Sequence, residues 1–362
     1  MIDSDHWPQL RSIGLSPLLV QRLAELPEPE PGTRLMRVTE VQRDALHLHD
    51  GEHDHLARPL PALLQALQLH DDALAVGDWV LATRNVHGQW WVGTRVPPAT
   101  QIARRLHDGR DKVTRTVIVS NVDTALLVMG LDHDYSLRRL ERYLALVRLA
   151  GVGAVVVLTK ADLCSGSADR LRQVQQLLPP DTAAVAVDGT RADTRETLAP
   201  WLAPGSTLVL LGSSGAGKST LTNTLLGHDV QDTGGTRKGD GRGRHTTTSR
   251  SLHLAPGGAC IIDTPGLRTL RLDSEAGDIG AVFDDIAQLA LQCRFRDCRH
   301  DDEPGCAVRG GVAPERLANY RKLLREARRD TMTALQRKEQ LQVWKQRSKA
   351  ARDVDRLKRG TT

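Results

Sequence analysis

Alternating apolar and polar positions mark the first part of the chain. Four short segments alternate well enough to predict strands: residues 34–41, 44–49, 76–83 and 89–96. The last two flank His87 and Gly88 and therefore predict a hairpin. Several short strands within about 65 residues are typical of a small barrel, and we expect an OB-type β-barrel. Trp90 and Trp91 are adjacent, so one of them should face outward; packing is the commoner role of such a residue, and stacking on RNA is the alternative.

After about residue 115, apolar runs alternate with segments of helical spacing. The runs predict strands at residues 116–119, 124–129, 153–158, 182–187, 207–211 and 259–263. Leucine and valine recur at helical spacing from Leu137 to Val147, and Gly151 closes this helix. A second helix is expected from about Ser167 to Leu178, before two prolines. This order predicts a doubly wound α/β domain whose parallel strands are buried on both faces.

Composition narrows the class of protein. The 362 residues allow two or three domains at roughly 150 residues each. The N-terminus shows no basic segment followed by an apolar one, and no apolar run approaches the ~18 residues of a membrane span. Five cysteines, an odd number, argue against a full disulfide framework and fit a reducing cytosol. We therefore expect a cytoplasmic protein without a membrane partner.

The net charge of +5 is unevenly distributed. Residues 315–362 carry fifteen Lys and Arg against six Asp and Glu, or +9, so the other 314 residues carry about −4. A long helix is expected from Pro314 onward, and its first part is basic through Arg316, Arg321, Lys322, Arg325, Arg328 and Arg329. Such a run is usually a solvated face, but contact with the phosphates of a polyanion is the favoured interpretation here.

One stretch matches the loop that cradles nucleotide phosphates. Residues 212–219 read Gly-Ser-Ser-Gly-Ala-Gly-Lys-Ser, the pattern G-x-x-x-x-G-K-[ST], between a predicted strand and a helix closed by Gly227. The glycines allow backbone N–H groups to point at phosphate oxygens, and the start of the helix adds its own. Lys218 would reach the β- and γ-phosphates, and the Ser219 hydroxyl would lie on Mg²⁺. A plain glycine-rich turn is the less favoured alternative.

A guanine-reading motif precedes the phosphate loop. Thr159-Lys-Ala-Asp162 follows a predicted buried strand, at the end where ligands bind in open α/β sheets. The Asp162 carboxylate can accept hydrogen bonds from both the ring N–H and the exocyclic amine of guanine, a pair that adenine does not offer. Lys160 would lay its aliphatic stem over the base. Lys-x-Asp at a solvated helix start is the alternative.

A third motif follows the phosphate loop. Asp263 ends a predicted strand and opens Asp-Thr-Pro-Gly266, in which Asp263 would hold Mg²⁺ directly or through water and the Gly266 N–H would meet the γ-phosphate. Residues 234–249 have the composition of a mobile loop, and one of its threonines, for which we select Thr247, would ligate Mg²⁺ only in the GTP state. The expected GTP contacts are Thr159, Lys160, Ala161, Asp162, Gly212, Ser213, Ser214, Gly215, Ala216, Gly217, Lys218, Ser219, Thr220, Asp263 and Gly266.

Three cysteines and one histidine lie within fourteen residues near the C-terminal end. Cys293, Cys298, His300 and Cys306 form the pattern C-x₄-C-x-H-x₅-C. Three soft thiolates and one imidazole suit a structural, tetrahedral Zn²⁺, one per chain. The alternative is buried cysteines beside an exposed histidine, which the polar neighbours Arg294, Arg296, Asp297 and Arg299 disfavour.

The order of these motifs is base reader, phosphate loop, mobile loop and Asp-Thr-Pro-Gly, whereas ordinary GTPases place the base reader last. The chain therefore resembles the circularly permuted GTPases. With a barrel in front and the Cys/His pattern behind, it is similar to the ribosome small-subunit-dependent GTPase A family over roughly residues 33–330. The metal pattern has that family's spacing. Two departures are Thr159 in place of the commoner Asn, and Val187-Asp-Gly189 in place of the usual Ser-Ala loop, to which we assign no contact.

The resemblance implies a function and its partners. Members of this family bind the small ribosomal subunit late in its assembly and hydrolyse GTP when the subunit stimulates them. We therefore expect a monomeric GTPase that binds GTP or GDP, the small subunit and rRNA. One alternative is a guanine-nucleotide-sensing, RNA-binding scaffold with negligible turnover. A phosphotransferase acting on a small molecule is disfavoured, because the guanine reader and Asp-Thr-Pro-Gly occur together.

None of the three motifs supplies the group that orients the attacking water. Ras-like enzymes use a glutamine just after Asp-x-x-Gly, but this chain has Leu267, which cannot hydrogen-bond. Intrinsic hydrolysis should therefore be slow. The nearest candidate for catalysis is His245 in the mobile loop; a solvent-exposed histidine or an RNA contact is nearly as good an interpretation.

The expected domain organisation follows from these segments. Residues 1–32, in which Pro-Glu-Pro-Glu-Pro occupies 27–31, should be a loosely ordered extension. The further domains expected are an OB-fold-like barrel at 33–105, a circularly permuted P-loop GTPase domain at 106–275, a zinc-binding helical module at 276–330 and a basic helical tail at 331–362.

Overall fold

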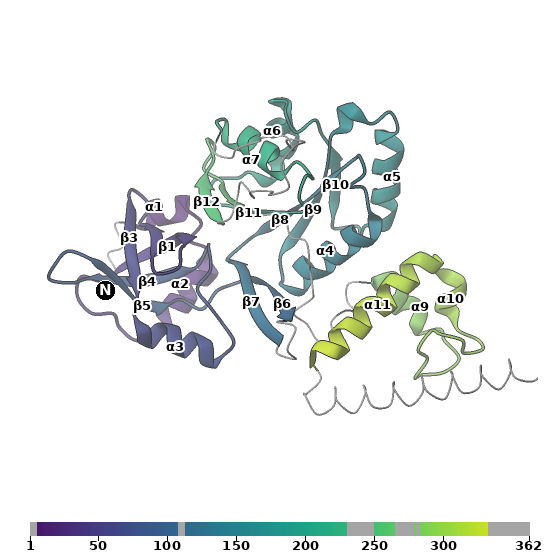
Figure 1. Cartoon of the computed structure of the whole chain (residues 1–362), viewed down its shortest axis with the longest axis horizontal. Coiled ribbons are helices and arrows are strands. Elements are labelled where there is room, and N and C mark those ends of the chain that lie inside the picture. Colours follow the sequence, from purple (N-terminus) through teal and green to yellow (C-terminus); the bar gives the residue numbers. More distant parts are fainter. Residues whose placement is uncertain (1–5, 108–112, 230–249, 265–278, 280–282, 332–362) are drawn as a thin grey trace, which may run out of the picture. The chain divides into compact units, whose positions relative to one another are not determined.

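The computed structural model describes residues 6–107, 113–229, 250–264, 279 and 283–331 (Figure 1). The chain divides into two compact units. The first is formed by residues 1–104 and 115–270, and the second by residues 105–114 and 271–362. The predicted domain boundaries are finer than this division and stay predictions. Within the described residues, no helix is both long enough and apolar enough to cross a membrane.

Five strands of the first unit close into a barrel. They are β1 (Arg34–Val41), β2 (Leu46–His49), β3 (Asp54–Pro59), β4 (Trp79–Arg84) and β5 (Trp90–Arg95). The pairs run β1–β2–β3–β5–β4, and β4 pairs back with β1; only β3 and β5 are parallel. Helix α3 (Pro61–Leu69) connects β3 to β4. This confirms the predicted OB-type barrel. Its core holds Trp90, which is buried, whereas Trp91 is half-buried.

The prediction of a loosely ordered N-terminal extension is wrong for residues 7–24. Helix α1 (Trp7–Ser12) and helix α2 (Pro17–Ala24) precede the barrel. Pro17 fits the first position of α2, and the Ser16 hydroxyl caps it by accepting a hydrogen bond from the Leu19 N–H at 3.3 Å. Leu10, Ile13 and Leu19 are at most 2% exposed, so burial of apolar side chains holds both short helices in place.

Six strands form the α/β part of the first unit. They are β8 (Thr124–Gly130), β9 (Gly153–Thr159), β10 (Ala183–Ala186), β11 (Thr207–Leu211), β12 (Ser251–Leu254) and β13 (Cys260–Asp263). Their order in the sheet is β10-β9-β8-β11-β13-β12, and all pairs are parallel except β12–β13. Ahead of them, β6 (Gln101–His107) and β7 (Val113–Ser120) form a separate two-stranded sheet.

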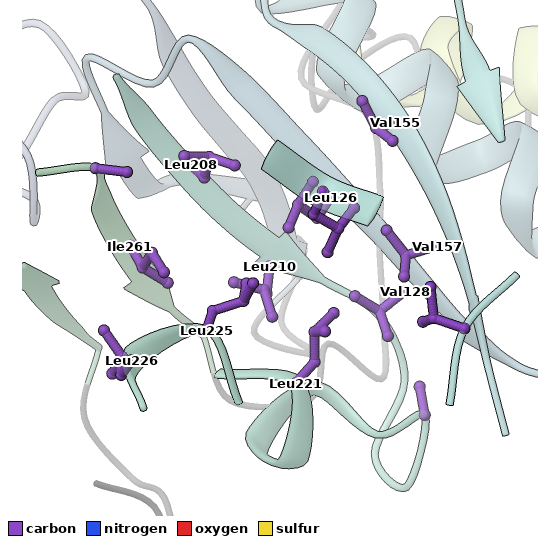
Figure 2. Packing of buried hydrophobic residues seen from close by; sticks show 14 residues of the cluster. Leu126, Val128, Val155, Val157, Leu208, Leu210, Leu221, Leu225, Leu226 and Ile261 are labelled. Atoms are coloured by element: carbon purple, nitrogen blue, oxygen red, sulfur yellow. The ribbon is translucent and has the colours of Figure 1, made fainter. Parts of the chain in front are cut away.

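Helices cover both faces of this sheet. They are α4 (Leu137–Leu149), α5 (Ser167–Leu177), α6 (Asp193–Leu198) and α7 (Lys218–Leu226), with single turns at Ala161–Leu163 and Ala199–Trp201. Alternate strand residues such as Leu126, Val128 and Leu210 pack with Leu221 and Leu225 of α7 (Figure 2). The intervening strand residues are buried as well, and α4 packs on β8 and β9 from the other face (Figure 1). The doubly wound α/β prediction is therefore confirmed.

Strand β1 also joins the barrel to the α/β sheet. It pairs with β12 at Glu40 and Ser251, so the two sheets are continuous. Arg37 of β1 is fully buried; its guanidinium donates to the Thr207 hydroxyl at 2.9 Å, to the Asn121 carbonyl at 3.1 Å and to the Ile13 carbonyl. One buried cation thus links the N-terminal helices, the barrel and the first residue of β11.

Residues 283–331 of the second unit contain three helices. They are α9 (Asp284–Ala290), α10 (Ala307–Gly311) and α11 (Pro314–Thr331), the last of which confirms the helix predicted from Pro314. Phe283 is 1% exposed and meets Tyr320 of α11 edge to face at 5.2 Å between ring centroids. Arg316 makes a bidentate ion pair with Asp285 at 2.7 and 2.9 Å. Arg321 lies 3.2 Å from Asp301, whereas Lys322 and Arg325 are exposed.

Candidate functional site

The sequence motifs converge at one edge of the α/β sheet. Strands β9, β8, β11 and β13 are consecutive neighbours and parallel, so their carboxyl ends lie at the same edge. Residues 160–162 follow β9, residues 212–219 follow β11, and Asp263 is the last residue of β13. Segments about 50 residues apart in the chain thus meet where open α/β sheets bind their ligands.

The phosphate loop has backbone geometry that demands its glycines. A Cβ at Gly212 would lie 2.4 Å from the Val128 carbonyl oxygen, so only glycine fits against β8. Gly215 and Gly217 have φ angles of 82° and 93°, a region that side chains disfavour. Gly217 caps the N-terminus of α7, whose first residues are Lys218, Ser219 and Thr220. The loop therefore ends on unpaired helix N–H groups, as an anion-binding loop requires.

Lys218 lies buried inside this loop. Its side-chain amine donates to the Ser213 carbonyl at 2.8 Å, and the residue is 6% exposed. Burial lowers the pKa of Lys218, although the nearby charges of Asp263 and Asp134 oppose this shift. A poorly solvated cation that is hydrogen-bonded to a neutral carbonyl gains most when an anionic phosphate enters the loop.

Asp263 has the properties of a metal ligand. It is 1% exposed, and burial raises its pKa to about 6, although attraction to Lys218 acts in the opposite direction. Its Oδ1 atom is buried and makes no hydrogen bond within the described residues. A hard carboxylate oxygen without a partner, beside a phosphate loop, fits a Mg²⁺ ion. Three further predicted site residues, Gly266, His245 and Thr247, lie outside the described residues.

The base reader is hydrogen-bonded to the phosphate loop. Thr159, at the end of β9, is 1% exposed and donates its hydroxyl to the Ala216 carbonyl at 2.6 Å. Lys160 has a φ of 60° and donates its amine to the Gly215 carbonyl at 2.8 Å. Asp162 lies exposed in the helical turn Ala161–Leu163, where its carboxylate is accessible to a ligand. The threonine at position 159 therefore connects the two motifs.

The structure adds two aspartates that the sequence motifs do not include. Asp132 accepts a hydrogen bond from Lys160, at 2.7 Å, and Asp134 accepts one from the Ser213 hydroxyl. Both lie in the loop that follows β8, between the base reader and the phosphate loop. The available signal was their position directly after a predicted strand, at the same edge as the other motifs; isolated aspartates in a loop otherwise resemble ordinary turn residues.

The Cys/His cluster of the second unit has the dimensions of a tetrahedral metal site. The ligand atoms of Cys293, Cys298, His300 and Cys306 all lie within 4.8 Å of one another. The sulfurs of Cys293 and Cys306 are 3.9 Å apart, and they lie 3.6 and 3.5 Å from His300 Nδ1. Tetrahedral zinc with Zn–S of about 2.3 Å and Zn–N of about 2.0 Å requires edges of about 3.8 Å and 3.5 Å. The four predicted ligands can therefore hold one metal ion.

Fold and site together define a P-loop GTPase with permuted motif order. Comparison with solved structures agrees on the fold: YjeQ from Thermotoga maritima has a TM-score of 0.58 at 24% identity, covering 82% of this chain and 98% of that one. YloQ, described as a circularly permuted GTPase, has a TM-score of 0.56 at 20% identity, covering 85% of this chain and all of that one.

Sequence comparison identifies the family. The model of the RsgA GTPase family matches residues 99–273. A protein named small ribosomal subunit biogenesis GTPase RsgA, from Xylella fastidiosa (strain M23), is 47% identical over 262 residues, covering 70% of this chain and 75% of that protein. A protein of the same name from Xanthomonas axonopodis pv. citri (strain 306) is 42% identical over 332 residues, covering 89% and 90%. The chain belongs to the RsgA GTPase family and is a GTP-hydrolysing enzyme.

Proposed function

We propose that this chain hydrolyses GTP as an assembly factor of the small ribosomal subunit, as the names of its relatives indicate for those proteins. The observation that carries the proposal is the convergence of Asp162, the phosphate loop and Asp263 on one sheet edge, in the family's permuted order. This arrangement supports guanine selection and phosphate binding at a single site. GTP and GDP are the ligands that it fits.

In the proposed site, each motif acts on a different part of the nucleotide. Asp162 accepts hydrogen bonds from guanine, with Lys160 along the base and Thr159 and Ala161 supporting them. The backbone of the phosphate loop and Lys218 neutralise the phosphates. Their contact residues are Gly212, Ser213, Ser214, Gly215, Ala216, Gly217, Ser219 and Thr220, with Gly266 beside the γ-phosphate.

Two metal ions complete the proposal. Ser219, Thr247 and Asp263 would hold Mg²⁺, which neutralises charge on the β- and γ-phosphates when bound. Cys293, Cys298, His300 and Cys306 would hold a structural Zn²⁺, because four protein ligands leave no position for a substrate. Three soft thiolates and one imidazole support zinc over harder ions.

The proposed partner of the second unit is rRNA. Lys322 and Arg325 are exposed cations of α11, whereas Arg316 and Arg321 are engaged with Asp285 and Asp301. The basic residues beyond 331 add to this charge in the sequence. Contact with rRNA phosphates is therefore assigned to Lys322, Arg325 and the tail, in a monomeric, cytoplasmic protein.

The decisive experiment measures GTP hydrolysis with and without small ribosomal subunits. We expect slow intrinsic turnover, because Leu267 occupies the place of the water-orienting glutamine, and a large increase on addition of subunits. Co-sedimentation with subunits in GDP and in a non-hydrolysable GTP analogue tests the binding step. Turnover that subunits leave unchanged, together with no co-sedimentation, contradicts the proposal.

His245→Ala tests the proposed catalytic group in the same assays. Loss of stimulated turnover, with nucleotide and subunit binding intact, supports a catalytic role for His245. Wild-type turnover in the variant eliminates that role and leaves the water-orienting group to another residue or to the ribosome.

A further inference from the structure

The loop between β8 and α4 occupies a central position in the nucleotide site. Strand β8 lies between β9 and β11 in the sheet, so the loop at its carboxyl end, residues 131–136, must lie between the base reader and the phosphate loop. We call these residues the β8 loop. None of the roles proposed above uses it, although it carries two aspartates that contact both motifs.

Asp132 holds the lysine of the base reader. Its Oδ2 atom accepts a hydrogen bond from Lys160 Nζ at 2.7 Å, while the same nitrogen donates to the Gly215 carbonyl at 2.8 Å. Its Oδ1 atom accepts the Asp134 N–H at 3.0 Å, which fixes the carboxylate within the loop. Burial acts to raise the pKa of Asp132, but Lys160, the Asp134 N–H and His133 together outweigh burial, so the pKa is lowered. Asp132 is therefore an ionised partner for Lys160 at neutral pH.

Asp134 fixes the other side of the same loop. Its carboxylate accepts the Gly130 N–H at 3.1 Å and the Ser213 hydroxyl, and it pairs with Arg139 of α4. Because Asp134 is only 7% exposed, its position is set by these contacts. The β8 loop is thus attached to the phosphate loop at Ser213 and, through Lys160, at Gly215.

Contacts from neighbouring elements hold the β8 loop rigid. The Leu131 N–H donates to the Thr159 carbonyl at 2.9 Å, and Arg170 of α5 donates to the Leu131 carbonyl at 2.9 Å. At the other end, the Tyr135 hydroxyl lies 2.8 Å from Gln173 Oε1 of α5. A carboxylate on so well anchored a loop is suited to fix a flexible lysine, whose four-carbon stem otherwise has many rotamers.

We propose that Asp132 is a positioning residue for nucleotide binding, which couples the base reader to the phosphate loop by holding the Lys160 amine against Gly215. This inference rests on the proposed function, in which the stem of Lys160 lies along the guanine base. Without Asp132 the Lys160 amine keeps the neutral Gly215 carbonyl as an acceptor, and the lysine stem samples other rotamers. Nucleotide binding must then order the stem, which lowers the affinity. Asp132 itself does not touch the ligand in this scheme.

A double-mutant cycle between positions 132 and 160 tests the coupling. We expect Asp132→Ala to weaken GDP binding about tenfold, as does loss of a hydrogen bond to a charged group. In a Lys160→Met background, Asp132→Ala should weaken it less than twofold further. Asp132→Asn keeps an acceptor oxygen and should recover part of the affinity. The matched control is Asp169→Asn, which removes an aspartate paired with Arg172 on the exposed face of α5 and should leave GDP affinity unchanged.

The readouts separate positioning from folding and from the proposed function. Urea unfolding without nucleotide should show that Asp132→Ala is folded. If this variant does not fold, the double-mutant cycle is measured with Asp132→Asn in its place. Additive effects at positions 132 and 160, or wild-type GDP affinity in the Asp132 variants, overturn the positioning role. GDP affinity of Asp162→Asn is measured in the same series. Wild-type affinity in that variant contradicts the proposed base reader. A large loss of affinity in Asp162→Asn, together with additive effects at positions 132 and 160, contradicts only the positioning role of Asp132.

Discussion

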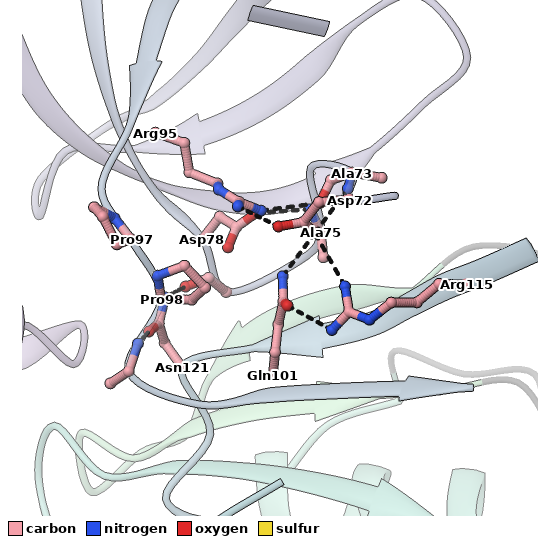
Figure 3. A network of polar contacts seen from close by, with 12 residues as sticks. Asp72, Ala73, Ala75, Asp78, Arg95, Pro97, Pro98, Gln101, Arg115 and Asn121 are labelled. Carbon is pink, nitrogen blue, oxygen red and sulfur yellow. Dashed lines mark hydrogen bonds and ion pairs between the residues drawn. The ribbon is translucent and has the colours of Figure 1, made fainter. Parts of the chain in front are cut away.

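The buried carboxylate of Asp78 should destabilise the fold at neutral pH, which is unusual for an aspartate. This aspartate lies directly before β4, fully buried, and accepts the Ala75 N–H at 2.9 Å; Arg95 lies 3.8 Å away and also pairs with Asp72 (Figure 3). Burial raises the pKa of Asp78 to about 6 from an ordinary 3.8, because the charge of Arg95 and the hydrogen bonds offset only part of the desolvation. We therefore expect the free energy of unfolding of Asp78→Asn, relative to that of wild type, to be higher at neutral pH than in acid.

The magnitude follows from linkage between folding and ionisation. A folded-state pKa above the unfolded one means that ionisation destabilises the fold, so this cost is absent at low pH and appears as pH rises through 3.8 towards 6. A difference of about two pKa units costs about 3 kcal/mol at pH 7.5 and about half of that at pH 5. Asparagine removes the charge. Its amide nitrogen, if left unpaired, costs about 1–3 kcal/mol, but this cost does not change with pH.

The assay is urea unfolding of wild type and Asp78→Asn at several pH values. The free energy of unfolding of the variant, relative to wild type, should fall by roughly 1–2 kcal/mol between pH 7.5 and pH 5. Asp72→Asn is the matched control with the opposite sign: burial acts to raise the pKa of Asp72, but Arg95, the Ala73 N–H and Gln101 together outweigh burial and lower the pKa. Its carboxylate therefore stabilises the fold at neutral pH, and the deficit of Asp72→Asn should shrink in acid. A stability difference for Asp78→Asn that is constant with pH refutes the reasoning.

Three further predictions concern the candidate sites. Cys298→Ser should lower bound zinc well below one per chain and destabilise the second unit, whereas Cys164→Ser, outside the cluster, should do neither. Zinc analysis and thermal unfolding measure both effects. A full zinc complement in Cys298→Ser contradicts the assignment. Asp263→Asn should abolish most of the gain in GTP affinity that Mg²⁺ provides, but leave the GTP affinity measured in EDTA unchanged. If titrations with and without Mg²⁺ match those of wild type, Asp263 is not a Mg²⁺ ligand. Thr159→Val should weaken GDP binding several-fold by leaving the buried Ala216 carbonyl unpaired, whereas Thr159→Ser should restore it; equal affinities of both variants argue against this bond.

Sequence patterns predicted the elements whose own residues show a continuous apolar run, an apolar alternation or a glycine at a helix end. Strand β11 has the predicted bounds, Thr207–Leu211, because it is an unbroken apolar run buried on both faces. Helix α7 ends at Gly227, as expected, and the φ of 76° there requires glycine or a strained residue. The barrel was predicted from four of its five strands. In each case the residue pattern and the final burial agree.

The elements missed by sequence reasoning are held by their neighbours. Strand β3 (Asp54–Pro59) alternates in exposure, but its one buried residue is Ala57 and its leucine, Leu56, is 60% exposed, so the sequence shows no alternation of apolar residues. Its pairing with β2 and β5 defines it. Helices α1 and α2 are six and eight residues long, too short for a helical period to be recognised. Tertiary contacts decide such segments, and a single sequence does not reveal them.

The site itself is determined by the order of strands in the sheet, and the order of motifs in the chain matters little. Moving the base reader ahead of the phosphate loop leaves β9, β8, β11 and β13 as neighbours, so Asp162, the β8 loop, Lys218 and Asp263 still meet at one edge. Motif recognition located three of these four groups, because a motif is defined by spacing within one segment. Asp132 and Asp134 belong to no such spacing, and they enter the site only because β8 separates the other two strands. In a parallel sheet, every strand between two binding loops must place its own carboxyl end between them, so the residues there are the first to test for an unassigned role.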